Sequence, residues 1–132
     1  MASGTIDELQ VGHVLQYVYL FLSEAEKGRD EGVKERPVVV IDIDYAAKRV
    51  AILAVTTKGE GRRNAVPIPA DVAAAAGLDH GSFVVTDEYN TFRWLGYDIR
   101  PVGDGWIRGR LTPGFTRSIR AMAHGATGIS RD

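Results

Sequence analysis

Two apolar segments joined by a short polar one constrain the fold of this chain more than any other feature. Residues 37–44 are mostly valine and isoleucine, and residues 50–55 continue the apolar character before Thr56 and Thr57. β-branched residues favour strands, and the polar residues 44–49 between the segments have the composition of a turn. Because apolar side chains fall on both faces, we predict an antiparallel hairpin of two central, buried strands.

Alternation along the first segment places Val39, Ile41 and Ile43 on one face and Val38 and Val40 on the other. Similar patterns predict further strands elsewhere. These segments are 14–22, 65–68, 82–87, 91–95 and 106–111, with 88–90 as a tight turn that returns one strand onto the next.

Two segments have the pattern of helices. Residues 69–76 begin with proline, are rich in alanine and precede Gly77, which suits a short connecting helix. A second helix begins at Thr112 as N-cap with Pro113 in its first turn, and it ends at Gly125. Its spacing places three apolar side chains on one buried face. They are Phe115, Ile119 and Met122.

The remaining segments are polar. Residues 23–35 are charged and contain two glycines, so we predict a long loop, and we expect residues 1–11 and 126–132 to be flexible. The chain as a whole is expected to form a single domain over residues 1–132. Short antiparallel strands with few helices indicate a mainly β fold, and their irregular loops favour a small β-barrel over a sandwich.

Composition excludes several classes of protein. The chain has no cysteine, which excludes disulfides and thiolate-bound metals and fits a cytoplasmic protein. The three histidines are scattered in sequence, so we expect no metal and no cofactor. The longest apolar run is too short to cross a membrane, and no signal peptide is expected.

Charge is unevenly distributed although the net charge is only −1. Residues 93–132 contain seven arginines, no lysine and three aspartates, whereas residues 1–92 have an excess of carboxylates. Arginine binds phosphate bidentately and stacks on bases, so this bias is compatible with nucleic acid as a partner. An arginine-rich solvated surface accounts for the same bias equally well.

Counting residues across the hairpin brings Arg36 close to the end of the opposite strand. With the turn centred near residues 46 and 47, Arg36 lies across from Thr56 or Thr57. A guanidinium offers a planar fork to two phosphate oxygens, and a threonine hydroxyl offers a further donor. The pair is therefore a candidate phosphate site. No histidine lies near it in the sequence, so these residues alone supply no proton carrier.

Five stretches of the chain together resemble the MazF/PemK-type toxins of bacterial toxin–antitoxin modules, especially the more divergent PemK-like branch. The stretches are 12–14 (Gly-His-Val), 19–21 (Tyr-Leu-Phe), 34–40 (Lys-Glu-Arg-Pro-Val-Val-Val), 54–58 (Ala-Val-Thr-Thr-Lys) and 85–92 (Val-Thr-Asp-Glu-Tyr-Asn-Thr-Phe). The resemblance implies an SH3-like antiparallel barrel with a C-terminal α-helix. It also implies a homodimer and a cognate antitoxin protein as partner.

The resemblance further implies metal-independent cleavage of single-stranded RNA, an endoribonuclease activity with Arg36 and Thr56 at its centre. Glu31 stands five residues before Arg36, the family's offset for a loop carboxylate, and becomes the candidate proton carrier. The chain departs from the family in its longer loop and in His13, where an acidic residue is usual.

Substrate contacts are expected from basic, hydroxyl and aromatic side chains, which suit phosphates and unstacked bases. The candidates are Thr57, Lys58, Arg62, Arg63, Arg93, Trp94 and Arg108. Core or dimer packing is an alternative role for Trp94. A second function stays open beside the endoribonuclease: a catalytically silent SH3-like module that binds RNA or an antitoxin peptide.

Overall fold

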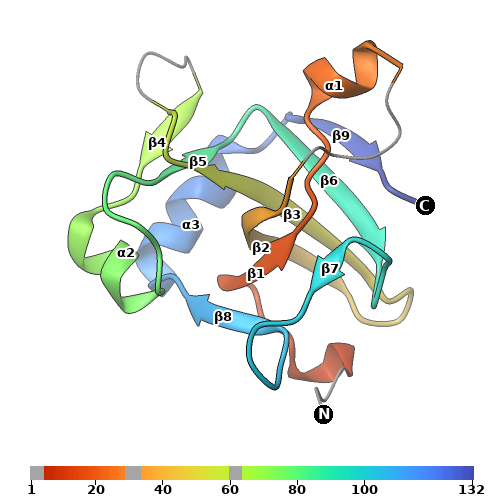
Figure 1. Ribbon diagram of the computed structural model, residues 1–132, viewed down its shortest axis with the longest axis horizontal. Helices are drawn as coiled ribbons and strands as arrows, with labels where there is room; N and C mark the ends of the chain where they lie inside the picture. The colour runs from red at the N-terminus through yellow and green to blue at the C-terminus, as the bar shows by residue number, and fades with distance from the viewer. Residues whose placement is uncertain (1–4, 29–33, 60–63) are drawn as a thin grey trace.

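The computed structural model describes residues 5–28, 34–59 and 64–132. Their elements follow one another along the chain as shown in Figure 1. They are a 3₁₀ helix η1 (Ile6–Glu8), β1 (His13–Tyr17), α1 (Leu22–Glu26), β2 (Arg36–Asp44), β3 (Arg49–Thr56), β4 (Ala65–Pro67), α2 (Ala70–Ala75), β5 (Phe83–Val85), β6 (Glu88–Arg93), β7 (Ile99–Arg100), β8 (Ile107–Arg110), α3 (Pro113–Met122) and β9 (Thr127–Ser130).

The described strands form one sheet, and all pairings but one are antiparallel. Its main path runs β4-β5-β3-β2-β1-β7, while β8 also pairs with β1 and β6 also pairs with β3. The exception is β9, which runs parallel to β6. The predicted mainly β fold with few helices is therefore confirmed. No helix in the described ranges is long and apolar enough to cross a membrane.

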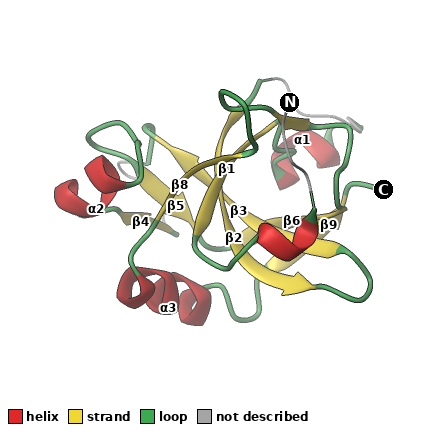
Figure 2. Ribbon diagram, turned by 90° about the horizontal axis from the view of Figure 1, so that it is seen from below, coloured by secondary structure: helices red, strands yellow, loops and turns green. Residues whose placement is uncertain are grey.

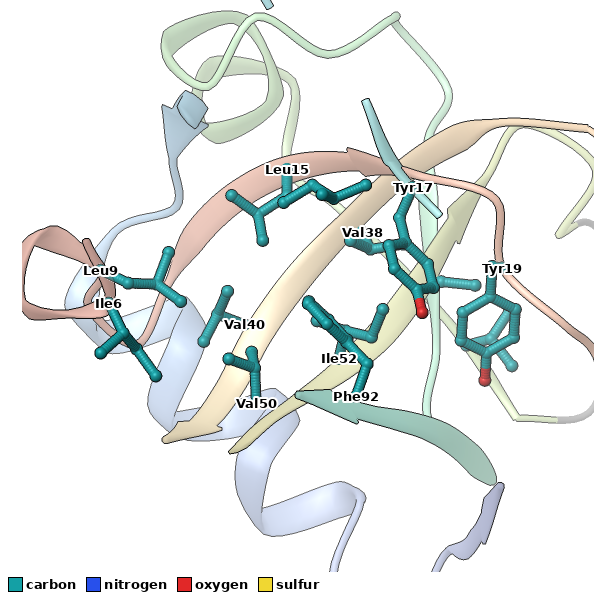
Figure 3. Close-up of a cluster of buried hydrophobic side chains, with 13 residues drawn as sticks. Ile6, Leu9, Leu15, Tyr17, Tyr19, Val38, Val40, Val50, Ile52 and Phe92 are labelled. Atoms are coloured by element: carbon teal, nitrogen blue, oxygen red, sulfur yellow. The ribbon is translucent and has the colours of Figure 1, made fainter. Parts of the chain in front are cut away.

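The β2–β3 hairpin is the centre of the sheet, as predicted, and both of its faces are covered. On one face Val38, Val40 and Ile52 pack with aromatic side chains of β1 and β6, as Figure 3 shows. On the other face Val39 and Leu53 pack against residues of α2 and α3, which lie outside the strands in Figure 2. Full burial of these valines and leucines is the main source of stability.

A β-bulge in β2 changes the predicted alternation. The register between β2 and β3 shifts between Val40 and Asp42. The extra residue rotates the chain beyond it, so Ile43 packs against the same cluster as Val40, whereas Ile41 packs with Val39 on the opposite face. The expectation that Ile43 shares a face with Val39 and Ile41 was therefore wrong.

Strand β1 is shorter than predicted, and the segment that follows it is more ordered than predicted. The strand over 14–22 ends at Tyr17, and the predicted loop over 23–35 begins inside α1. Helix α1 begins where the Glu24 carboxylate accepts a hydrogen bond from the Phe21 amide at 3.0 Å. The buried Glu88 carboxylate of β6 accepts from the Leu22 amide at 2.9 Å, which fastens the helix to the sheet.

The segment 82–95 does not form the predicted hairpin. Strand β5 pairs with the end of β3 at Thr56, and β6 pairs with the start of β3 at Arg49. Strands β5 and β6 both run antiparallel to β3, one after the other. The residues between them therefore bend the chain but do not reverse its direction. The predicted tight turn at 88–90 instead belongs to β6.

Both predicted flexible ends contain ordered parts. Near the N-terminus, Ile6 and Leu9 are buried in the core. At the C-terminus, residues 127–130 form β9 and pair with β6. Helix α3 begins as predicted, with the Thr112 hydroxyl accepting from the Phe115 amide, but Met122 is 54% exposed and does not belong to its buried face.

A pH dependence of stability follows from the start of β1. Burial lowers the pKa of His13 below its ordinary value of 6.5, and the charge of Arg110 lowers it further. The His13 Nδ1 accepts a hydrogen bond from the Gln10 amide at 2.9 Å, which requires this nitrogen to be unprotonated. At pH values near and below the ordinary pKa of histidine, the unfolded chain therefore binds more protons at His13 than the folded protein does. Folding is less favourable at these pH values.

We expect the free energy of unfolding to fall as the pH is lowered from about 7.5 to about 5.5. The substitution His13→Asn keeps an acceptor near the position of Nδ1 and removes the titration. It should flatten the pH dependence over this window in urea unfolding followed by circular dichroism. Equal slopes for the two proteins would contradict a role for His13.

Candidate functional site

A cavity of about 440 Å³ opens where β2 begins and β3 ends. Polar and charged side chains dominate its wall. The lining residues are Gln16, Lys34, Glu35, Arg36, Pro37, Val55, Thr56, Thr57, Lys58, Asp79, Ser82 and Arg108. Five of the predicted site residues meet here. They are Arg36, Thr56, Thr57, Lys58 and Arg108.

The strand register brings the two central residues together. Val38 pairs with Ala54, and continuing this register places Arg36 opposite Thr56. On its other side, Arg36 is paired with Tyr17 of β1. Counting from the turn alone left Thr56 and Thr57 as alternative partners of Arg36. The bulge in β2 shifts the register by one residue, which places Thr56 opposite Arg36.

Arg36 and Thr56 are each held by a local contact. The Arg36 guanidinium carbon lies 4.7 Å from the centre of the Phe21 ring, a cation–π contact that orients its planar fork. The Thr56 Oγ1 accepts a hydrogen bond from the Lys58 amide at 3.0 Å. A hydroxyl that accepts in this way still has its own proton to donate.

Arg108 reaches the cavity from β8, on the far side of β1. Its Nε and Nη2 donate to the Gly77 carbonyl at 3.1 and 2.8 Å, and its Nη1 donates to Gln16 Oε1 at 3.0 Å. These contacts hold the guanidinium beside the cavity, where it is only partly exposed. Two arginines from distant parts of the chain therefore border one cavity.

Gly109 allows β8 to approach α2 closely enough for the Arg108 contacts. A Cβ at Gly109 would lie 2.3 Å from the Ala76 carbonyl oxygen, closer than such atoms approach. We therefore expect Gly109→Ala to lower the free energy of unfolding by about 2 kcal/mol, as overpacking does. Gly105→Ala is the matched control, because a Cβ at Gly105 meets nothing within 4 Å. Urea unfolding of both variants measures the difference, and equal stabilities would show that β8 can move away without cost.

The charges around the cavity favour an anion. Among the described residues, four cationic side chains and two carboxylates line it, so the balance of their charges is positive. The carboxylates belong to Glu35 and Asp79, and both residues are exposed. Neither carboxylate was among the site residues predicted from the sequence. Glu35 could have been noticed because it precedes Arg36, whereas nothing near Asp79 in the sequence points to the hairpin.

Two other predicted site residues do not join this cavity. Arg93 and Trp94 line a separate cavity near β6, and Trp94 also packs against the core cluster. Glu31, Arg62 and Arg63 lie outside the described residues. Among the described residues, no three histidine, aspartate or glutamate side chains come together as a metal site.

Comparisons with protein-family models, with curated proteins and with solved structures find no match to this chain.

Proposed function

We propose that the chain is a metal-independent endoribonuclease that cleaves single-stranded RNA. The observation that supports it most is the meeting of Arg36, Thr56, Lys58 and Arg108 around one cavity. These side chains supply several donors for the oxygens of one phosphate group. The positive balance of the lining charges attracts the RNA backbone.

The reaction uses the ribose 2′-oxygen as the nucleophile. A carboxylate takes the 2′-hydroxyl proton, the 2′-oxygen bonds to phosphorus, and the bond from phosphorus to the 5′-oxygen breaks. A water molecule gives a proton to the departing 5′-oxygen, and the hydroxide formed takes the proton back from the carboxylic acid. The products are a 2′,3′-cyclic phosphate and a 5′-hydroxyl. Arg36 and Thr56 donate to the phosphate oxygens whose negative charge increases in the transition state.

Glu35 and Asp79 line the cavity and join Glu31 as candidates for the carboxylate in this scheme. Glu35 directly precedes Arg36 in the chain, and Asp79 lines the cavity from the segment that follows α2. Either group accepts a proton when ionised. Substitution of Glu35 and Asp79 tests the two candidate bases among the described residues, and Glu31 stays a prediction.

The remaining expectations from the MazF/PemK resemblance belong to the same proposal. They are a closed SH3-like barrel, a homodimer, a cytoplasmic toxin and inhibition by a cognate antitoxin protein.

A silent binding module is the second candidate, and one observation favours it. Both carboxylates of the cavity are exposed to solvent, and the lining contains no histidine. A solvated carboxylate is a weak base for a ribose hydroxyl. Such a module would bind RNA or an antitoxin peptide through the same arginines without cleaving the strand.

Incubation of the purified protein with several unrelated long single-stranded RNAs in EDTA tests the proposal. Discrete fragments that end in cyclic phosphate would support the endoribonuclease. Glu35→Gln and Asp79→Asn remove one proton acceptor each with little change in shape, so the variant that loses cleavage but keeps RNA binding identifies the base. If the unaltered protein binds these RNAs and leaves them intact, the binding module replaces the enzyme.

A further inference from the structure

A second cavity, of about 410 Å³, lies between the end of β6 and the C-terminus. Unlike the first, it is lined largely by aromatic and apolar side chains, and it shares no lining residue with the first. The lining residues are Tyr17, Phe92, Arg93, Trp94, Leu95, Gly96, Tyr97, Asp98, Arg131 and Asp132. Its volume lies in the range of small-ligand sites.

Aromatic rings form two parts of this cavity. Tyr17 and Phe92 are stacked with their ring centres 4.6 Å apart, and Trp94 lies 6.3 Å from Phe92 at a tilt. Tyr17 and Phe92 are buried and fixed, whereas Trp94 is partly exposed. Tyr97, in the loop after β6, is fully exposed although it lines the same cavity. Trp94 is therefore the ring of this aromatic wall that faces solvent, and it lies in the same cavity lining as the uncovered Tyr97.

Charged groups border the aromatic wall. The Asp98 Oδ2 is bound to Arg131 Nη2, which leaves its second oxygen as an acceptor. Asp132 is held ionised. Burial by itself would raise its pKa, but hydrogen bonds from Arg49, the Arg93 amide and Ser130 keep the pKa below its ordinary value. Arg93 adds an exposed cation.

This combination matches the chemistry of a nucleobase. A base has two flat faces that stack on aromatic rings and an edge that donates and accepts hydrogen bonds. Carboxylate oxygens accept from an exocyclic amino group, and an exposed arginine pairs with the phosphate attached to the sugar. An aliphatic ligand would fill the cavity but would make no hydrogen bonds to the carboxylates or to the arginine.

We propose that this cavity binds an unstacked nucleobase, supplied either by a free nucleotide or by a single-stranded nucleic acid. The proposal does not depend on RNA cleavage, because the two cavities are made of different residues. Stacking involves Trp94 on the wall and Tyr97 at the rim, and the carboxylates of Asp98 and Asp132 contact the edge of the base.

Fluorescence of Trp94 tests the proposal directly. The chain has two tryptophans, and Trp106→Phe leaves Trp94 as the reporter. The Trp106 indole nitrogen has no hydrogen-bond partner among the described residues, so this change removes no hydrogen bond. The protein is titrated with AMP, GMP, CMP and UMP, with short single-stranded oligoribonucleotides, with ribose 5-phosphate and with N-acetyltyrosinamide.

We expect saturable quenching by nucleotides or oligoribonucleotides and none by ribose 5-phosphate. Tyr97→Ala should weaken binding about tenfold, the effect of losing one stacking partner. Tyr45→Ala should leave it unchanged, because Tyr45 is also exposed but lines none of the described cavities. Saturation by mononucleotides identifies a free nucleotide as the source, and saturation by oligoribonucleotides alone identifies a strand.

Arg36→Ala separates this site from the phosphate cavity. Quenching that persists in Arg36→Ala places the base in the second cavity whether or not the protein cleaves RNA. Quenching by no nucleotide or oligoribonucleotide, or equal affinity in Tyr97→Ala, would overturn the proposal. Quenching by N-acetyltyrosinamide alone would also overturn it and would indicate a site for an aromatic side chain of a protein partner.

Discussion

Arg36→Ala is expected to reduce the rate of RNA cleavage by about 10²- to 10³-fold, the loss that follows removal of one preorganised donor from a transition state. The backbone of Arg36 is paired with Tyr17 of β1, and its guanidinium lies against the Phe21 ring. In the proposed reaction this contact would let it donate to the phosphate without first being ordered. Single-turnover cleavage of a defined oligoribonucleotide measures the effect.

Two controls separate this role from a general loss of charge or structure. Arg36→Lys keeps the charge but loses the planar fork, so it should restore only a small part of the rate. Circular dichroism shows whether the fold survives the loss of the Phe21 contact. A rate in Arg36→Ala within about threefold of the unaltered protein contradicts transition-state stabilisation by this residue.

The threonines provide a further test of the register. Thr56→Val should lower the rate, whereas Thr57→Val should have little effect, because Thr56 lies across from Arg36.

Hairpin counting in the sequence predicted that Arg36 lies near these threonines, since local pairing is determined by one turn and one apolar pattern. The bulge between Val40 and Asp42 was not predictable, because no glycine or proline marks it.

The rest of the candidate site depends on contacts between distant segments. Arg108 comes to the cavity because β8 pairs with β1, and Asp79 because it follows a helix that packs under β8. Periodicity gives the faces of single elements but not which elements become neighbours. Arg108 was predicted only as one arginine among several, and Asp79 was missed.

The C-terminal strand shows another limit of the pattern. Residues 126–132 contain one large apolar side chain, so they lack the alternation of a strand. Their order comes from backbone pairing with β6 and from the polar contacts of Arg131. Neither can be seen in a sequence read for apolar periodicity.

We expect Arg131→Met to lower the free energy of unfolding by about 3 kcal/mol, because it removes one partner of a largely buried ion pair. The Arg131 side chain is only 3% exposed and donates to the Val18 carbonyl, to Asn90 and to the Asp98 carboxylate. Without the guanidinium, these three acceptors each lose a donor in a partly dry environment, although Asn90 Oδ1 keeps its hydrogen bond from the Leu20 amide. Methionine retains much of the side-chain volume, so the loss is mainly polar. Urea unfolding measures it.

Arg49→Met is the matched control, since Arg49 also bonds a residue of the same C-terminal segment. Its ion pair with Asp132 is exposed, with 38% and 40% of the two side chains accessible, and such pairs contribute about 1 kcal/mol or less. The two variants therefore compare the loss of a buried arginine with the loss of an exposed one. Release of β9 in Arg131→Met would also uncover the edge of β6, so we expect this variant to self-associate on size-exclusion chromatography. Equal destabilisation by the two substitutions would show that β9 is held by its backbone pairing and not by the buried guanidinium.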